Sequence, residues 1–179
     1  IVARNRNFFG TIRVHRQEIG PATAIHSLMH GRVCHGIQIT AGPLQHRPST
    51  YYCENSGVGL AISNHPRRDF SLRIGMLGMG IGVLCAYGRP GDELRFYELN
   101  PAVLMYAKDT RLFTYLAECP ADVTIVAGDA RRSLASELET SGSHEFDLLV
   151  VDVFSGDSIP IHFLTEEAFD LYFQHLSDE

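Results

Sequence analysis

The segment Leu72-Arg73-Ile74-Gly75-Met76-Leu77-Gly78-Met79-Gly80-Ile81-Gly82 is an apolar run that ends in three alternating glycines. A short apolar run bounded by a turn signal is typical of a buried strand. Gly78, Gly80 and Gly82 would let the backbone approach a ligand closely and expose the amides of a following helix to it. Because such glycine turns are common, this segment alone is weak evidence for a ligand site. The rest of the chain supplies the further evidence.

Three further apolar runs follow, and each ends in a carboxylate: residues 94–97 before Glu98, residues 123–127 before Gly128-Asp129, and residues 146–151 before Asp152. The carboxyl ends of parallel strands meet at one edge of an open α/β sheet, and ligands bind at that edge. The sequence therefore predicts a glycine loop and three carboxylates side by side.

Helix signals alternate with these runs. Capping residues precede helical patterns at three places: Asn100-Pro101, Asp129 before residues 130–134, and Thr165 before residues 166–176. Strands that alternate with helices form a parallel, doubly wound sheet.

The amino-terminal part has a different pattern. Three segments rich in β-branched and apolar residues are separated by glycine and proline: residues 8–16, 23–29 and 32–40. They predict a small antiparallel β region, followed by a short helix at residues 57–62. We expect two domains, a β-strand region over residues 1–66 and a nucleoside-binding α/β domain over residues 67–179.

The position of Glu98 narrows the ligand class. Glu98 lies twenty residues beyond Gly78, where a carboxylate would accept hydrogen bonds from both ribose hydroxyls. A dinucleotide fingerprint requires glycine three residues past Gly80, but Val83 stands there. We therefore expect a Rossmann-like sheet of the S-adenosylmethionine-dependent methyltransferase type, truncated after its fourth strand and the following helix. Asp129 fits an acceptor for the adenine amino group, or a plain helix cap.

Charge is divided unevenly along the 179 residues. Residues 1–68 hold 8 Arg and 2 Glu, a net of +6, and residues 69–179 hold 7 Lys+Arg and 19 Asp+Glu, a net of −12. An acidic second half argues against nucleic acid as a partner and favours a small cationic substrate, although an acidic solvated surface explains the same count.

The cysteines and histidines favour a reducing compartment without a metal. The four cysteines are far apart with no CxxC pair, which indicates free buried thiols and a cytoplasmic protein. The histidines are scattered, so we expect no metal site. Because the chain begins at Ile1, the alternative is that it forms the soluble part of a membrane-attached protein with membrane segments outside this chain.

Asp152 is the candidate for chemistry. A carboxylate at the end of the fourth strand faces the reactive end of a bound cofactor. It could accept a proton from an attacking amine or hold that amine's charge. Capping of the loop at residues 154–158 is the structural alternative.

These segments together resemble the spermidine/spermine synthases (polyamine aminopropyltransferases), and bacterial spermidine synthase-like proteins most of all. The resemblance covers roughly residues 32–179 and rests on four motifs: the glycine loop, Tyr97-Glu98-Leu99-Asn100-Pro101, Gly128-Asp129-Ala130, and Asp152 through Leu164-Thr165-Glu166-Glu167. It implies transfer of an aminopropyl group from decarboxylated S-adenosylmethionine to an amine, with release of methylthioadenosine. It also implies a homodimer formed through the β region.

The resemblance assigns roles by position. Glu98 would hold the ribose, Asp129 with Ala130 would hold the adenine, and Gln38 would lie near the sulfur of the nucleoside. Asp152 would deprotonate the attacking amine. Tyr52 would line the amine pocket.

The chain departs from the family where cations bind. Ile81 stands in place of the glycine-loop Asp that contacts the aminopropyl amine, and Ser155 replaces the second Asp of Asp-x-x-Asp. Asp157, two residues later, is the candidate substitute. Because an uncompensated buried ammonium is costly, the acceptor need not be putrescine.

Three functions are consistent with these residues. The first is an aminopropyltransferase-like enzyme with altered specificity. The second is a non-catalytic nucleoside-binding domain, and the third is a methyltransferase that uses S-adenosylmethionine itself. We expect them in that order, because the acidic second half favours the first.

Overall fold

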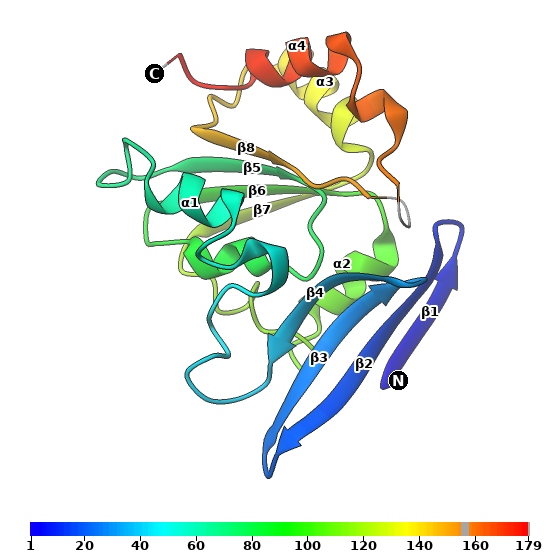
Figure 1. Ribbon diagram of the computed structural model, residues 1–179. Helices are drawn as coiled ribbons and strands as arrows, with labels where there is room; N and C mark the ends of the chain where they lie inside the picture. The colour runs from blue at the N-terminus through cyan, green and yellow to red at the C-terminus, as the bar shows by residue number, and fades with distance from the viewer. Residues whose placement is uncertain (155–157, 179) are drawn as a thin grey trace.

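We describe the fold from a computed structural model, which covers residues 1–154 and 158–178. It contains two four-stranded sheets, one antiparallel and one parallel, with helices on both faces of the parallel sheet (Figure 1). This is the predicted architecture of a methyltransferase-type parallel sheet with a small antiparallel β region.

The antiparallel sheet is a meander of consecutive strands, β1 (Ala3–Asn7), β2 (Gly10–Gly20), β3 (Thr23–His30) and β4 (Val33–Ile39). Ile12, Val14 and Leu28 are fully buried and belong to the same hydrophobic cluster as the parallel sheet. They alternate with more exposed residues, as expected where one face of a sheet is covered. Strand β1 was not predicted from the sequence, because this edge strand is largely polar and charged.

The parallel sheet contains β5 (Arg73–Leu77), β6 (Glu93–Glu98), β7 (Asp122–Ala127) and β8 (Leu148–Val151), in the order β7-β6-β5-β8. All three pairings are parallel, which confirms the four predicted runs. β5 pairs on both sides, and four of its five residues are buried, so its sequence is continuously apolar rather than alternating. The chain moves outward from β5 to β7 and returns to β8, so strand order reverses between β5 and β8.

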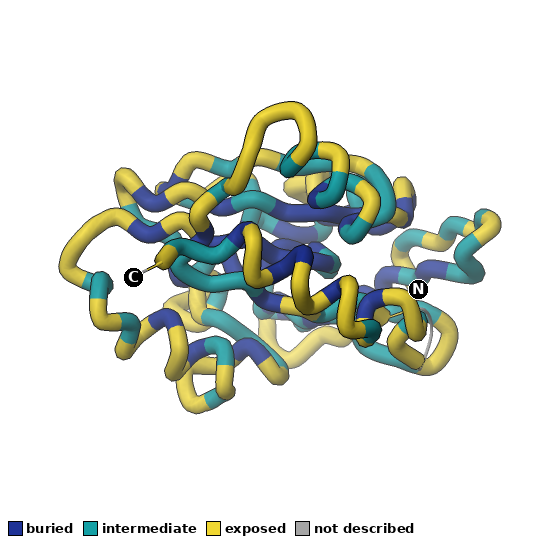
Figure 2. Tube along the Cα trace, turned by 90° about the horizontal axis from the view of Figure 1, so that it is seen from above, coloured by how far each residue is buried: buried dark blue, intermediate teal, exposed yellow. Residues whose placement is uncertain are grey.

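The described residues form seven helical segments, five before β8 and two after it: η1 (Thr50–Tyr52), α1 (Gly57–Ser63), η2 (Val83–Tyr87), α2 (Pro101–Lys108), α3 (Ala130–Ser141), η3 (Ile161–Phe163) and α4 (Glu166–Gln174). The three predicted caps are confirmed, since Asn100, Asp129 and Thr165 each accept a hydrogen bond from a backbone amide in the first turn. Helices α3 and α4 cover one face of the parallel sheet and α1 and α2 the other (Figure 1). The central strands β5 and β6 between these layers are largely buried, whereas the outer strands β7 and β8 are mostly half-buried or exposed (Figure 2).

One expectation about the glycine loop is wrong. The loop leads into the five-residue 3₁₀ helix η2 and not into an α-helix. Gly82 adopts a left-handed conformation (φ +79°) and Gly88-Arg89-Pro90 follows η2, so too few residues remain for a full α-helix. At the sheet edge where a ligand is expected to bind, the glycine loop therefore supplies backbone groups. No long helix follows the loop to add its first amides.

Three other features bear on the sequence analysis. Cys85 is buried, Cys34 and Cys119 are half-buried and Cys53 is exposed, so the expectation of four buried thiols holds in full for Cys85 alone. No helix in residues 1–154 and 158–178 is long and apolar enough to cross a membrane. The division into domains between residues 66 and 67 stays a prediction. Helix α1, which belongs to the predicted amino-terminal region, packs against β8 of the parallel sheet.

Asp92 links the segments that come just before β5 and β6. Its carboxylate is fully buried and accepts hydrogen bonds from the Leu72 amide (2.9 Å) and the Arg89 amide (3.0 Å), with the Arg68 guanidinium at 3.4 Å. Burial opposes ionisation, but the hydrogen bonds from Leu72 and Arg89 outweigh it and hold the pKa of Asp92 below its ordinary value. The ionised carboxylate is therefore part of the folded state.

We expect Asp92→Asn to lower the free energy of unfolding at pH 7 by roughly 2–3 kcal/mol, because an amide cannot accept from all these donors. Because the folded-state pKa is lowered, the stabilisation by Asp92 is present above the unfolded pKa of about 3.9 and is lost as pH falls through the folded value. Urea unfolding at neutral and acidic pH measures this. Asp122→Asn, at an exposed position of β7, is the control, and equal stability of both variants at pH 7 would contradict the prediction.

Candidate active site

A cleft opens at the carboxyl edge of the parallel sheet, where β5, β6 and β8 end. Its empty space is about 770 Å³, including the part open to solvent, which suits a nucleoside-sized ligand. Its lining comes from both sheets: Phe9, His30, His35, Gly78, Gly80, Tyr97, Glu98, Leu99, Asn100, Val103, Gly128, Ala130, Asp152, Val153, Phe154, Pro160 and Phe163. The predicted edge is thus one side of this cleft, and the antiparallel sheet supplies the other.

Glu98 is buried at the end of β6 and braces the glycine loop. Its carboxylate accepts hydrogen bonds from the backbone amides of Met79 (3.1 Å) and Asn100 (2.7 Å). Burial raises the pKa of Glu98, and the hydrogen bonds from these amides counteract the shift. Each carboxylate oxygen has a further lone pair, so Glu98 can still accept from a pair of ligand hydroxyls.

The first two loop glycines allow three chain segments to meet. A Cβ on Gly78 (φ +87°) would lie 2.2 Å from the Asp152 carbonyl oxygen, and a Cβ on Gly80 (φ +55°) would lie 2.8 Å from the His35 carbonyl oxygen. Only glycine combines this conformation with this closeness. Gly82 does not line the cleft and packs against Leu116.

Asp152 follows β8 and faces two tyrosines. The hydroxyls of Tyr51 (3.2 Å) and Tyr52 both donate to Oδ2 of Asp152. Burial and the nearby Asp152 charge raise the pKa of both tyrosines, so both hydroxyls stay protonated as donors. Both of these bonds go to Oδ2, and no described residue is a hydrogen-bond partner of Oδ1.

Ala130 and Asp129, the two residues predicted to contact adenine, differ in their surroundings. Ala130 lines the cleft together with Gly128. Asp129 caps α3 by accepting from the Arg132 amide (3.0 Å), and its Oδ2 lies 3.1 Å from Nε2 of His162. The helix-cap interpretation of Asp129 is therefore confirmed, and its contact with adenine stays a prediction.

Gln38 lies away from the cleft lining. Its Nε2 donates to the Thr114 hydroxyl and the Gln45 carbonyl, both at 2.9 Å, and its Oε1 accepts from the Thr114 amide at 2.8 Å. These bonds hold β4 against the segment after α2, which is a structural role. Tyr52 reaches the site through Asp152, and Asp157 lies outside the described residues.

The contribution of the antiparallel sheet to the cleft was not predicted from the sequence. Phe9, His30 and His35 line the cleft, although they lie far from the Rossmann-like motifs in sequence. His30 Nε2 lies 2.5 Å from the Phe9 carbonyl oxygen, and the rings of His30 and His35 lie 5.6 Å apart. Burial, aided by His30, lowers the pKa of His35, so its imidazole is neutral at pH 7.

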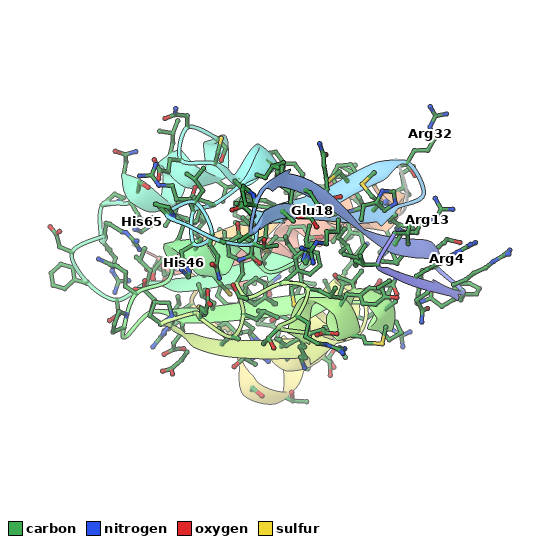
Figure 3. The ribbon with its side chains drawn as sticks, turned by 90° about the horizontal axis from the view of Figure 1, so that it is seen from below. Arg4, Arg13, Glu18, Arg32, His46 and His65 are labelled. Atoms are coloured by element: carbon green, nitrogen blue, oxygen red, sulfur yellow. The ribbon has the colours of Figure 1, made fainter. Side chains whose placement is uncertain are left out.

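The charges in the described lining are negative. Glu98 and Asp152 are its carboxylates, and it includes no Lys or Arg. Arg4, Arg13 and Arg32 lie together at one end of the molecule (Figure 3). Within the described residues, no three side chains of metal-ligating type gather. A ligand that carries positive charge matches this cleft.

Comparison with solved structures finds the same fold in two spermidine synthases. A probable spermidine synthase from Corynebacterium glutamicum is 18% identical with a TM-score of 0.66, covering 99% of this chain and 61% of that one. The spermidine synthase from Thermotoga maritima is 17% identical with a TM-score of 0.52, covering 93% and 54%.

A methyltransferase shares the fold as well. Human methyltransferase-like protein 13, solved in complex with SAH, is 20% identical with a TM-score of 0.51, covering 66% of this chain and 56% of that one. This chain thus spans between about half and three fifths of the length of these proteins. The sequence itself matches no family model and no curated protein sequence. The likeness shows the fold of S-adenosylmethionine-related transferases.

Proposed function

We propose that this chain binds a sulfonium nucleoside of the S-adenosylmethionine type and transfers an alkyl group from its sulfur to an amine. Its first form is aminopropyl transfer from decarboxylated S-adenosylmethionine, as in the spermidine synthases that share the fold. The observation that carries the proposal is that Glu98 and Asp152 line one cleft at the point where strand order reverses.

The nucleoside side of the cleft fits the donor. Glu98 has lone pairs for the two ribose hydroxyls, and the glycine loop supplies close backbone. Gly128 and Ala130, which are small, line the cleft and leave room for the base. The negative charge of Glu98 and Asp152 favours the sulfonium cation over a neutral analogue.

On the side of the cleft where the amine would bind, Asp152 is the proton acceptor. Asp152 would hold the incoming ammonium through Oδ1 while the Tyr51 and Tyr52 hydroxyls fix Oδ2. After the ammonium gives one proton to Asp152, the neutral amine attacks the alkyl carbon next to sulfur. The C–N bond forms as the C–S bond breaks, and the electron pair returns to sulfur, which becomes a neutral thioether.

Methyl transfer from S-adenosylmethionine is the second candidate, favoured by one observation. Ile81, where the spermidine synthases have an Asp for the aminopropyl amine, is fully buried and packs toward Gly36. The described lining therefore gives the aminopropyl ammonium no carboxylate of its own besides Glu98 and Asp152.

One assay with two donors tests both candidates. The chain is incubated with decarboxylated or intact S-adenosylmethionine and a panel of mono- and diamines, and the released nucleoside is separated by chromatography. We expect methylthioadenosine from the decarboxylated donor. S-adenosylhomocysteine from the intact donor would support methyl transfer instead. Nucleoside binding without release from either donor would leave the non-catalytic binding function.

A further inference from the structure

A second cavity adjoins the cleft on the acceptor side. It is lined by Val33, Cys34, His35, Tyr51, Asp152 and Phe154, with about 420 Å³ of empty space including the part open to solvent. His35, Asp152 and Phe154 line both cavities. Asp152 therefore stands at the junction, where an acceptor in the side cavity would meet a donor in the cleft.

The walls of this side cavity are largely apolar. Val33, Phe154 and Tyr51 line it, and Phe154 and Tyr51 are 45% and 48% exposed. The Tyr51 hydroxyl is engaged with Asp152 and the Cys34 thiol with the Gly36 carbonyl (3.6 Å). Exposed apolar surface beside a reactive group gains free energy when an apolar ligand group covers it.

Within its described lining, the cavity can balance one positive charge. Asp152 is the carboxylate among its described lining residues, and neutral His35 adds no charge. The ammonium of a monoamine can pair with Asp152 while its carbon chain covers Phe154 and Val33. A diamine would place its second ammonium against the apolar walls, and an unpaired buried charge is costly.

From these observations we propose that the side cavity is the acceptor subsite and that it takes a monoamine with an apolar body in preference to a diamine. The inference rests on the proposed function, because Asp152 at the junction is the proton acceptor there. It names the substrate class: a primary amine with a single positive charge and an alkyl or aromatic substituent.

Hexylamine and 1,6-diaminohexane provide a matched test, because they differ by one terminal ammonium. Binding is measured by calorimetry with methylthioadenosine present, and turnover by nucleoside release. We expect hexylamine to bind about tenfold more tightly or better, and to give the higher kcat/KM. Equal or tighter binding of the diamine would overturn the proposal.

A charge placed on the wall should reverse the preference. Val33→Asp adds a second carboxylate to the side cavity, and we expect it to tighten 1,6-diaminohexane binding about tenfold, while Val33→Asn, of nearly the same size, does not. The same gain in both variants, or in neither, would contradict the subsite. Thermal melts verify that both variants fold.

The binding and turnover measurements separate the two proposals. Preferential binding of hexylamine without release from either donor supports the subsite and overturns the proposed transfer. Release with a preference for the diamine supports the transfer and overturns the subsite.

Discussion

Replacing Glu98 by alanine is expected to weaken methylthioadenosine binding by at least about a hundredfold, since each hydrogen bond to a charged acceptor contributes about 1.5–3 kcal/mol. Two such bonds are available, one from each ribose hydroxyl. The substitution also removes the acceptor for the Met79 and Asn100 amides, so the glycine loop loses its brace. Calorimetric titration of the nucleoside into the folded chain measures the loss.

The matched control is Glu93→Ala, because Glu93 is an exposed glutamate at the opposite end of the same strand, β6. Its affinity should equal that of the parent chain. Glu98→Gln separates the two effects of Glu98, because the amide keeps the volume but cannot accept from both backbone amides and both hydroxyls. If Glu98→Ala binds the nucleoside as tightly as Glu93→Ala, the ribose site lies elsewhere.

The pH dependence of binding provides an independent test of Glu98. The ionised carboxylate accepts from both hydroxyls, whereas the protonated acid has one donor of its own. Affinity should therefore fall as the pH drops into the range where Glu98 protonates. Burial moves that range above the ordinary value for a glutamate.

The strands and helix caps were predictable from sequence because their signals are local. The run before Gly78 is apolar because β5 is buried on both faces, and Asn100 and Thr165 cap helices that begin one residue later. The edge where these strands end follows from chain topology once the strands are parallel. For that reason Glu98 and Asp152 could be placed together without a structure.

The residues that were missed depend on how the two sheets pack. Phe9, His30 and His35 reach the cleft through contacts between segments far apart in the sequence, which no periodicity records. Gln38 shows the reverse case. Its motif predicted a ligand contact, but its amide group donates to Gln45 and the distant Thr114 and accepts from the Thr114 amide. The short η2 was missed because an αL glycine at its start and a glycine-proline segment at its end together outweigh an otherwise helical composition.

Asp152→Asn is expected to reduce turnover by about 10²–10⁴-fold while methylthioadenosine affinity stays unchanged. An amide cannot take the proton of the attacking ammonium, and its neutral group no longer pairs with the ammonium charge. The nucleoside affinity should survive because Glu98 and the glycine loop are untouched. Single-turnover nucleoside release at saturating amine, with calorimetry alongside, measures both quantities, and Asp170→Asn at an exposed site of α4 is the control.

Substitution of Tyr52 distinguishes a role of Asp152 as proton acceptor from a purely structural role of its charge. Tyr52→Phe removes one donor to Oδ2 but leaves the Tyr51 hydroxyl and the Asp152 carboxylate in place. Turnover should therefore fall far less than in Asp152→Asn, by about tenfold if one hydrogen bond of roughly 1.4 kcal/mol is lost. A loss of nucleoside affinity in Asp152→Asn would instead assign Asp152 to the donor. Unchanged turnover in Asp152→Asn would exclude it as the proton acceptor, since no other described residue lining the junction of the two cavities is a carboxylate.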